Sequence, residues 1–368
     1  MPPRVAPFRA RPPWIGGTLQ TIRALRWPLR APLPAGERLW LPLADGDALA
    51  ATLHLPPRPP PGRRPLALLV HGLAGTEDDP CVREAAAGLL RRGFPVLRFN
   101  LRGSAPSNPR STSHYHVGRS EDLAEALAAL PEALTGAGVL VAGWSLGGAL
   151  AIHLLGRYAG AASSGGGRVP RLLGGAAVCP PLQPELAHAT IDANPVFGRL
   201  LLALYRREVL AVCDARDLPE SLRDAARAAR SLREFEATVT APRFGYPSYE
   251  VFVEVHRPAA VLPGLRAPLL LIMAKDDPLV PPDSLDGIAW AECPAVAPLL
   301  VAGGGHCGFY DRGRESLSVR AIGAFFDGLA ERAVSEDSDG AITSAAAVQG
   351  AESSPSSIAQ QAASTALA

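Results

Sequence analysis

Short apolar runs alternate along this chain with segments in which apolar residues recur at helical spacing. A continuous apolar run is typical of a strand buried on both faces of a parallel sheet, whereas a spacing of three or four residues is typical of a helix. The apolar runs lie at residues 66–70, 95–100, 139–142, 172–178, 268–274 and 298–302, and the helical segments at residues 80–92, 121–130 and 146–158. This alternation predicts an α/β fold with a mostly parallel central sheet flanked by helices.

The first of these helical segments carries signals at both of its ends. Asp79 is placed to cap the helix, and Pro80 suits the first helical position, where a missing N–H costs nothing. Two arginines near the other end suit the negative pole of the helix dipole, and Gly93 follows them as a terminating residue. A helix is therefore expected to begin at Pro80, directly after the first buried strand.

Regions at and near the chain ends fall outside the alternation. Residues 1–62 are proline-rich and are expected to form an irregular N-terminal extension that wraps the core, with the regular domain spanning residues 63–330. Residues 331–368 are rich in Ser, Ala, Gly and Gln and contain no aromatic residue, so a disordered tail is expected there. Within the domain, the sequence AASSGGG at residues 161–167 predicts a flexible surface loop.

One long interval inside the domain has no apolar run. Residues 181–263 instead show helical charge patterns, for example at residues 218–235, which predicts a helical cap inserted at the carboxyl edge of the sheet. The leucine, phenylalanine and tyrosine side chains of this interval fit two interpretations. They could line an apolar acyl-binding site or form the core of the cap itself.

Composition narrows the class of protein. The chain has 36 Lys+Arg against 35 Asp+Glu, a net charge of +1 that gives no electrostatic support for nucleic-acid binding. No stretch approaches the about 20 consecutive apolar residues of a membrane-spanning helix. The first 30 residues are rich in arginine and contain tryptophan, so this segment could lie on a membrane surface instead of wrapping the core. The five cysteines include no CxxC pair, which argues against a disulfide framework or a zinc knuckle. The cysteines are expected to be reduced, and a cytoplasmic location is expected for the protein.

The strongest chemical motif is a GxSxG sequence at residues 143–147. It follows the apolar run at residues 139–142 and opens the helical segment at residues 146–158, the context of a nucleophile elbow with Ser145 at its tip. Small residues on both sides allow the tight turn, and the helix N-terminus favours negative charge nearby. The alternative is a glycine-rich helix start with an incidental serine.

A serine nucleophile requires a base and an acid that orients the base. Asp277, in the sequence AKDDPLVP, follows one apolar run, and His306, in GGGHCG, follows the last one. Their order after Ser145 is one used by serine enzymes built on a parallel sheet, whose strand ends converge on one crevice. Asp277 is favoured over Asp276 because it starts an Asp-x-x-Val-Pro sequence just past the strand end, which leaves Asp276 a solvated or capping role.

An acyl-transfer site also requires two backbone N–H groups for the oxyanion. The Leu146 N–H follows the nucleophile and supplies the first. The sequence HGLAG after residue 70 closes the first buried strand, and its Leu73 N–H is the candidate for the second. His71 is interpreted as a residue that organises this loop by hydrogen bonding and not as a catalyst.

These motifs together resemble the YheT-like hydrolases, or AB hydrolase 4 family, of the α/β-hydrolase superfamily. The resemblance covers most of residues 10–330. Its more specific elements are WIGGTLQT at residues 14–21, FNLRG at 99–103, YHVG at 115–118, EDL at 121–123, FEATVTAP at 235–242 and FGY at 244–246. It implies an α/β-hydrolase fold, hydrolysis of a small-molecule carboxylic ester through an acyl-enzyme, no cofactor, and a triad of Ser145, Asp277 and His306.

The chain departs from the family pattern at two places, Thr18 in place of a histidine and Ser104-Ala105-Pro106 in place of a Cys/Gly run. The departures spare the triad but weaken any inference of substrate. A thioesterase or acyltransferase that uses the same triad stays an alternative, as does a non-catalytic binding protein on this scaffold.

His114 and His116 form an HxH pair that could bind a metal ion. No acidic residue or cysteine accompanies them at ligand spacing, so no metal is expected. The resemblance makes His116 a structural residue near the site.

Overall fold

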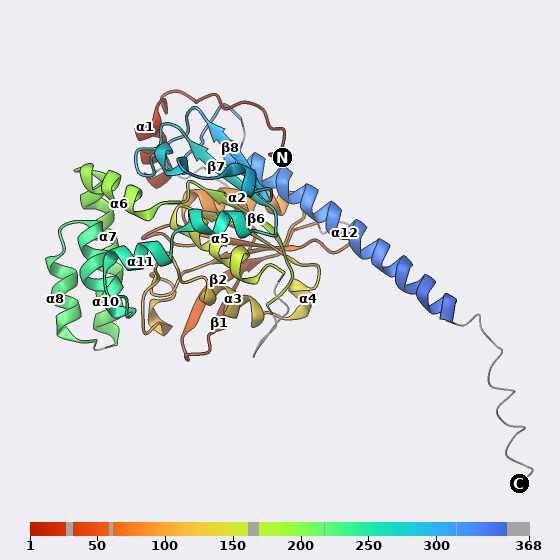
Figure 1. The fold of residues 1–368 in the computed structure, drawn as a ribbon, viewed down its shortest axis with the longest axis horizontal. Helices are drawn as coiled ribbons and strands as arrows, with labels where there is room; N and C mark the ends of the chain where they lie inside the picture. The colour runs from red at the N-terminus through yellow and green to blue at the C-terminus, as the bar shows by residue number, and fades with distance from the viewer. Residues whose placement is uncertain (27–31, 59–61, 161–168, 217, 314, 352–368) are drawn as a thin grey trace, which may run out of the picture. The chain divides into compact units, whose positions relative to one another are not determined.

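The computed structural model describes residues 1–26, 32–58, 62–160, 169–216, 218–313 and 315–351, with side chains through residue 336. Within these residues, one eight-stranded sheet forms the centre of the unit Met1–Asp327, in the order β1-β2-β4-β3-β5-β6-β7-β8 (Figure 1). The strands are β1 (Glu37–Pro42), β2 (Ala48–His54), β3 (Leu66–Val70), β4 (Val96–Phe99), β5 (Val139–Trp144), β6 (Leu172–Val178), β7 (Leu269–Ala274) and β8 (Val296–Val301). The predicted mostly parallel sheet is confirmed.

Strand direction divides the sheet into two parts. Strands β3 to β8 are parallel to one another, whereas β2 pairs antiparallel with β4, and β1 pairs antiparallel with β2. Every residue of β3, β4, β5 and β7 is buried, as expected for strands covered on both faces. Chain order reverses at β3, which has β4 on one side and β5 on the other, and such a switch point opens a crevice at the carboxyl ends of the strands.

The helices predicted between the strands are present. They are α2 (Pro80–Arg91), α3 (Glu121–Ala128) and α5 (Leu146–Tyr158), and a short helix that was not predicted, α4 (Glu132–Thr135), follows α3. Asp79 holds the N-cap position of α2 as expected, but its side chain makes no bond to the helix. The carboxyl instead accepts a hydrogen bond of 3.1 Å from the Thr76 N–H, so it braces the loop after β3 rather than the helix.

The N-terminal region differs from the prediction. Residues 1–62 contain α1 (Gly17–Arg26) and both antiparallel strands, so the expectation that regular structure begins only at residue 63 is wrong. The strand β2 has the sequence ALAATLH, and β1 has one fully buried position, so neither shows the continuous branched apolar run by which the other strands are recognised. Their pairing with each other and with β4 decides their structure.

Only helices and turns connect β6 to β7 within the described residues. They are α6 (Pro184–Ala193), α7 (Phe197–Ala215), α8 (Glu220–Ala228), α9 (Leu232–Phe235), the π-helix η2 (Glu236–Thr240), α10 (Ala241–Arg243), α11 (Tyr249–Val255) and η3 (Pro258–Gly264), most of them drawn in green in Figure 1. The helical charge pattern noted at residues 218–235 corresponds to two helices, because α8 ends at Ala228. Ser231 starts α9 instead, because its side chain accepts a hydrogen bond from the Glu234 N–H.

The chain divides into two units, Met1–Asp327 and Gly328–Ala368. Helix α12 (Leu317–Ala351) extends into this second unit, so the first part of the expected disordered tail is helical. The rest of the tail, residues 352–368, and the loop expected at residues 161–167 lie outside the described residues. None of the helices in the described part is both long and apolar enough to cross a bilayer.

Arg102, from the sequence FNLRG, joins three segments through a buried ion-pair network. Its guanidinium, 2% exposed, donates two hydrogen bonds to Asp122 of α3, of 2.9 and 2.8 Å. It also pairs with Asp45 at 2.8 Å and with the buried Asp47, both in the turn between β1 and β2. The network fastens this turn and α3 to the loop after β4, and neighbouring carboxylates raise the pKa of Arg102 despite its burial.

We predict that Arg102→Met lowers the free energy of unfolding by about 3–5 kcal/mol, because it leaves buried carboxylates without a counter-charge. Urea unfolding followed by circular dichroism measures the change. The control is Arg227→Met, which removes an exposed pair with Glu220 and should change stability far less. Equal effects of the two substitutions would contradict the role given to the network.

Candidate active site

Ser145 stands at the sharp turn between β5 and α5. Its backbone has φ 53° and ψ −121°, a region that L residues rarely occupy, and its N–H donates a 2.8 Å hydrogen bond to the Val178 carbonyl of β6. Such strain persists only where the surrounding structure holds it. The backbone therefore has the geometry of a nucleophile elbow, in agreement with the GxSxG prediction.

Close packing explains the two glycines of the motif. A Cβ on Gly143 would lie 2.0 Å from the Gly147 carbonyl oxygen, and a Cβ on Gly147 would lie 2.3 Å from the carbonyl oxygens of Val70 and His71. Neither site has room for a side chain. The start of α5 therefore packs directly on the backbone at the end of β3.

Asp277 and His306 meet as the sequence predicted. The Asp277 Oδ2 atom lies 2.8 Å from Nδ1 of His306, so Nδ1 carries the proton of this hydrogen bond, and Nε2 is the other ring nitrogen. The second oxygen of Asp277 accepts hydrogen bonds from the N–H groups of Leu279 (2.8 Å) and Val280 (3.0 Å). The carboxyl is fully buried and its orientation is fixed by these three bonds.

Asp276, the acid that the sequence ranked second, has a different position. Its Oδ1 atom accepts a 2.8 Å hydrogen bond from the Gly305 N–H, so it caps the loop that carries His306. This is the capping role that the sequence analysis allowed for it. The two neighbouring aspartates therefore act on the same histidine loop, one on the imidazole ring and the other on the backbone.

Helix α1 also holds the histidine loop, a contact that the sequence analysis did not foresee. The Thr21 hydroxyl accepts a 2.8 Å hydrogen bond from the His306 N–H and donates to the Gly17 carbonyl, also at 2.8 Å. The Gln20 side chain bridges the Trp14 carbonyl to the backbone N–H and carbonyl of Tyr310. The available signal was the WIGGTLQT segment, whose last two residues, Gln20 and Thr21, bond to the loop.

The HGLAG loop lies against the serine. A Cβ on Gly72 would approach the Ser145 Cβ to 3.2 Å, and Ala74 has a positive φ of 55°. His71 organises the loop as expected, because its Nε2 accepts a hydrogen bond from the Leu101 N–H (3.0 Å) and its Nδ1 lies 2.8 Å from the Gly72 carbonyl. Burial lowers the pKa of His71 to about 4, which keeps the ring neutral.

A hydrogen-bonded chain ties this loop to helix α7. The Ala74 N–H donates a 2.6 Å hydrogen bond to the Tyr115 hydroxyl, which in turn donates to Oε2 of Glu208 at 2.7 Å. Burial raises the pKa of Glu208 to about 7 although the Tyr115 bond opposes the shift. Tyr115 belongs to the YHVG segment, so this sequence element reaches the loop after β3 through its hydroxyl group.

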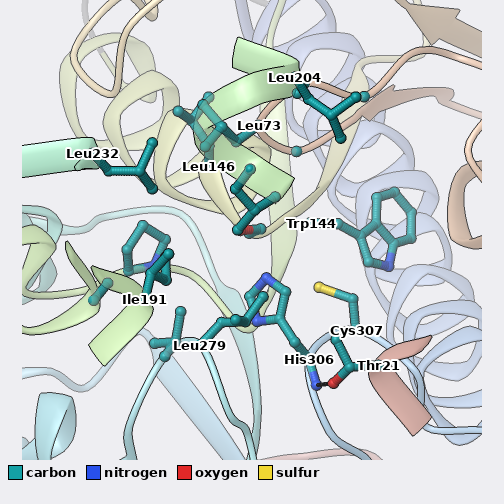
Figure 2. Close-up of a pocket in the computed structure, with 18 of the residues that line it drawn as sticks. Thr21, Leu73, Trp144, Leu146, Ile191, Leu204, Leu232, Leu279, His306 and Cys307 are labelled. Carbon is teal, nitrogen blue, oxygen red and sulfur yellow. Dashed lines mark hydrogen bonds between the residues drawn. The ribbon is translucent and has the colours of Figure 1, made fainter. Parts of the chain in front are cut away.

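Ser145 and His306 line one cavity of about 440 Å³ together with Leu73 and Leu146. Figure 2 shows Leu73 and Leu146 in the upper part of the view and His306 below them, with the bond from His306 to Thr21 dashed. The remaining wall is largely apolar and includes leucines of α7. Leu146 is the first residue of α5, so its N–H has no acceptor within the helix and is available at this wall.

One cluster of possible metal ligands occurs among the described residues. Ligand atoms of Cys179, His306 and Cys307 lie within 4.8 Å of one another. Burial raises the pKa of both thiols, and a metal ligand must be a thiolate, so these residues fit a metal poorly.

His116, of the HxH pair, packs against two rings. Its ring centroid lies 4.5 Å from that of Phe244 and 5.1 Å from that of His256, which fits the structural role expected for it.

The known proteins to which the chain is similar include esterases. It is 25% identical over 287 residues to the medium-chain fatty acid ethyl ester synthase/esterase 2 of Saccharomyces cerevisiae, a match that covers 71% of this chain and 62% of that protein. The chain thus spans less than two thirds of this relative. It is 28% identical over 289 residues to the putative esterase YheT of Escherichia coli, covering 75% of this chain and 78% of YheT, which agrees with the resemblance seen in the motifs.

The fold comparison is consistent with these relatives. The crystal structure of the 2,6-dihydroxy-pseudo-oxynicotine hydrolase superposes with a TM-score of 0.53 at 17% identity, covering 87% of this chain and 72% of that one. The sequence model described as the alpha/beta hydrolase fold matches residues 65–313. That match includes every strand from β3 to β8, Ser145, Asp277 and His306, and the chain therefore belongs to the alpha/beta hydrolase family.

Proposed function

We propose that this protein is a serine hydrolase that cleaves carboxylic esters through an acyl-enzyme. The observation that supports it most is the 2.8 Å bond between Asp277 and His306, whose imidazole lines the same cavity as Ser145 at its strained turn. Ser145 is the nucleophile, His306 the general base and Asp277 the group that orients the base. The curated relatives that carry esterase in their names favour an ester as substrate.

The proposed reaction has two halves. The Ser145 hydroxyl oxygen attacks the ester carbonyl carbon while Nε2 of His306 takes the hydroxyl proton, and Asp277 stabilises the imidazolium through its bond to Nδ1. The tetrahedral intermediate collapses, the carbon–oxygen bond to the alcohol breaks, and His306 returns the proton to the leaving alcohol. Water then attacks the acyl-enzyme with His306 again as base, which releases the acid and restores Ser145.

The Leu73 and Leu146 N–H groups are the proposed oxyanion donors. Both residues line the cavity, and Gly72 brings the first of these loops against Ser145. Donors fixed in the backbone stabilise developing negative charge without reorganising during the reaction. The chain from Ala74 through Tyr115 to Glu208 then positions the loop that carries the Leu73 N–H.

The proposed substrate carries an apolar acyl chain. Residues 181–263 act in this proposal as a cap on the domain at residues 63–330, and their leucines supply much of the apolar wall. The name of the yeast relative pairs synthase with esterase, which favours a second candidate activity, transfer of the acyl group to an alcohol in place of water. Both activities use the same acyl-enzyme.

We predict that Ser145→Ala abolishes turnover of p-nitrophenyl esters and labelling by a fluorophosphonate probe, because both require the serine oxygen. Labelling is measured by fluorescence after electrophoresis of the purified full chain. Ligand-induced shifts in melting temperature serve as the control that the pocket still binds. If the variant is labelled at the rate of the parent protein, Ser145 is not the nucleophile.

The two aspartates give a matched comparison. Asp277→Asn should lower kcat by about 10⁴-fold, because an amide favours the wrong imidazole tautomer. Asp276→Asn should cost far less, because the Asp276 carboxyl bonds to the backbone N–H of Gly305 and not to the imidazole. Steady-state kinetics on one ester measures both, and a larger loss in Asp276→Asn would show that the assignment of the acid is wrong.

Tyr115 offers a test of the positioned oxyanion loop. Tyr115→Phe removes the acceptor of the Ala74 N–H, so we expect kcat to fall about tenfold while KM stays nearly constant. The control is Tyr205→Phe, which removes a 3.1 Å bond to the Tyr115 carbonyl and leaves that acceptor in place. A rise in KM with unchanged kcat, or the same loss of kcat in the control, would contradict the positioning role.

A further inference from the structure

Glu236 is a buried acid whose place in the cavity the proposed reaction does not use. It begins the π-helix η2, between α9 and α10, and comes from the FEATVTAP segment. Single π-turns recur at functional sites, where they project a side chain that a regular helix would place elsewhere. Glu236 lines the same cavity as Ser145 and His306 and is 6% exposed.

The carboxyl of Glu236 lacks a full set of partners within the described residues. Its Oε2 atom is buried and receives no hydrogen bond from any described group. Burial raises the pKa of Glu236 to about 7, and the nearby Thr240 hydroxyl acts in the opposite direction without making a hydrogen bond of ordinary geometry. A buried acceptor left unpaired costs free energy, and this one lies on the wall of a cavity, where a ligand can supply the missing donor.

The charge of the cavity wall limits what can bind there. Its side chains include the carboxyls of the half-buried Asp79 and the buried Glu236, and no arginine or lysine among the described lining residues. His188 also lines the cavity, and burial lowers its pKa to about 4, so it contributes no positive charge at neutral pH. A substrate that carried a carboxylate or phosphate into the cavity would meet acidic groups without a counter-charge.

We propose that Glu236 forms a polar subsite that binds a hydroxyl group on an uncharged ester substrate. This inference rests on the proposed function, because it assigns a substrate class to the same cavity. Glu236 is then a specificity-determining residue, remote from the bond that breaks, and the substrate class is a hydroxylated ester rather than a plain hydrocarbon ester or an anionic lipid.

Hydrogen-bonding capacity favours a hydroxyl over an ammonium group. A hydroxyl has one donor, which the unpaired Oε2 atom of Glu236 can accept, whereas a primary ammonium has three donors, most of which a largely apolar wall would leave unpaired. The carboxyl accepts such a bond in either protonation state. Asp79 is a weaker candidate for this role because its Oδ1 already accepts the Thr76 N–H.

The first experiment compares substrates that differ by one hydroxyl. One pair is p-nitrophenyl octanoate and its terminal-hydroxyl analogue, and the other is ethyl octanoate and 2-hydroxyethyl octanoate, so that acyl and alcohol sides are both sampled. A third compound carries a terminal ammonium. We expect at least one hydroxylated ester to exceed its plain counterpart in kcat/KM by about tenfold or more, because a site built for a hydroxyl loses its bond with the plain analogue.

Variants then connect this preference to Glu236. Glu236→Met should abolish the preference while it preserves or raises kcat/KM on the plain ester. Glu236→Gln, whose amide oxygen still accepts a hydrogen bond, should retain most of the preference and provides the test if the methionine variant does not fold. The matched control is Thr240→Val, on the same π-turn, which should keep the preference of the parent protein.

Three results would overturn the assignment. They are equal kcat/KM for all matched esters in the parent protein, a loss in Glu236→Met that is the same on every ester, and a preference for the ammonium ester. Failure of the proposed function has a separate signature, the absence of turnover on any ester. Binding is therefore also measured by calorimetry in the Ser145→Ala protein, with octanol and octanediol as ligands. Tighter binding of the diol than of octanol supports the subsite if the added substitution Glu236→Met abolishes the difference. Equal binding of the two ligands contradicts the subsite.

Discussion

The parallel register of β3, β5, β7 and β8 is the constraint on which the site depends. Strands that run in one direction present their carboxyl ends at one edge, so the segments that follow them meet there. His71 to Gly75 follow β3, Ser145 follows β5, Asp277 follows β7 and His306 follows β8. The strained backbone at Ser145 is tolerated because the buried strands around it cannot shift.

Elements outside the parallel sheet hold the loops at this edge. Helix α1 reaches the histidine loop through Thr21, whereas α7 reaches the loop after β3 through Glu208 and Tyr115. Both contacts bond backbone N–H groups of the site loops and leave the reacting side chains free. The N-terminal segment and the helical insertion, which are far apart in the sequence, therefore both contribute to the shape of the site.

Two kinds of buried charge occur in this molecule, and their surroundings separate them. Asp47 and Asp122 lie in a closed network in which Arg102 satisfies them, as expected for a structural role. Glu236 faces a cavity and has an oxygen without a protein partner among the described residues. A buried carboxylate paired with Arg102 thus stabilises the fold. The unpaired carboxyl oxygen of Glu236 has a free acceptor site that faces the cavity.

The sequence by itself determined the parallel strands, most helices between them and the candidate residues Ser145, Asp277 and His306. Buried strands and tight turns leave local signals, because they require continuous apolar residues and glycines at fixed spacing. Only the tertiary structure decided that β1 and β2 extend the sheet and that Thr21 and Glu208 brace the site loops. It also decided that Glu236 faces the cavity. These features depend on contacts between residues far apart in the chain, and no local pattern of apolar and polar positions records which distant partner a side chain meets.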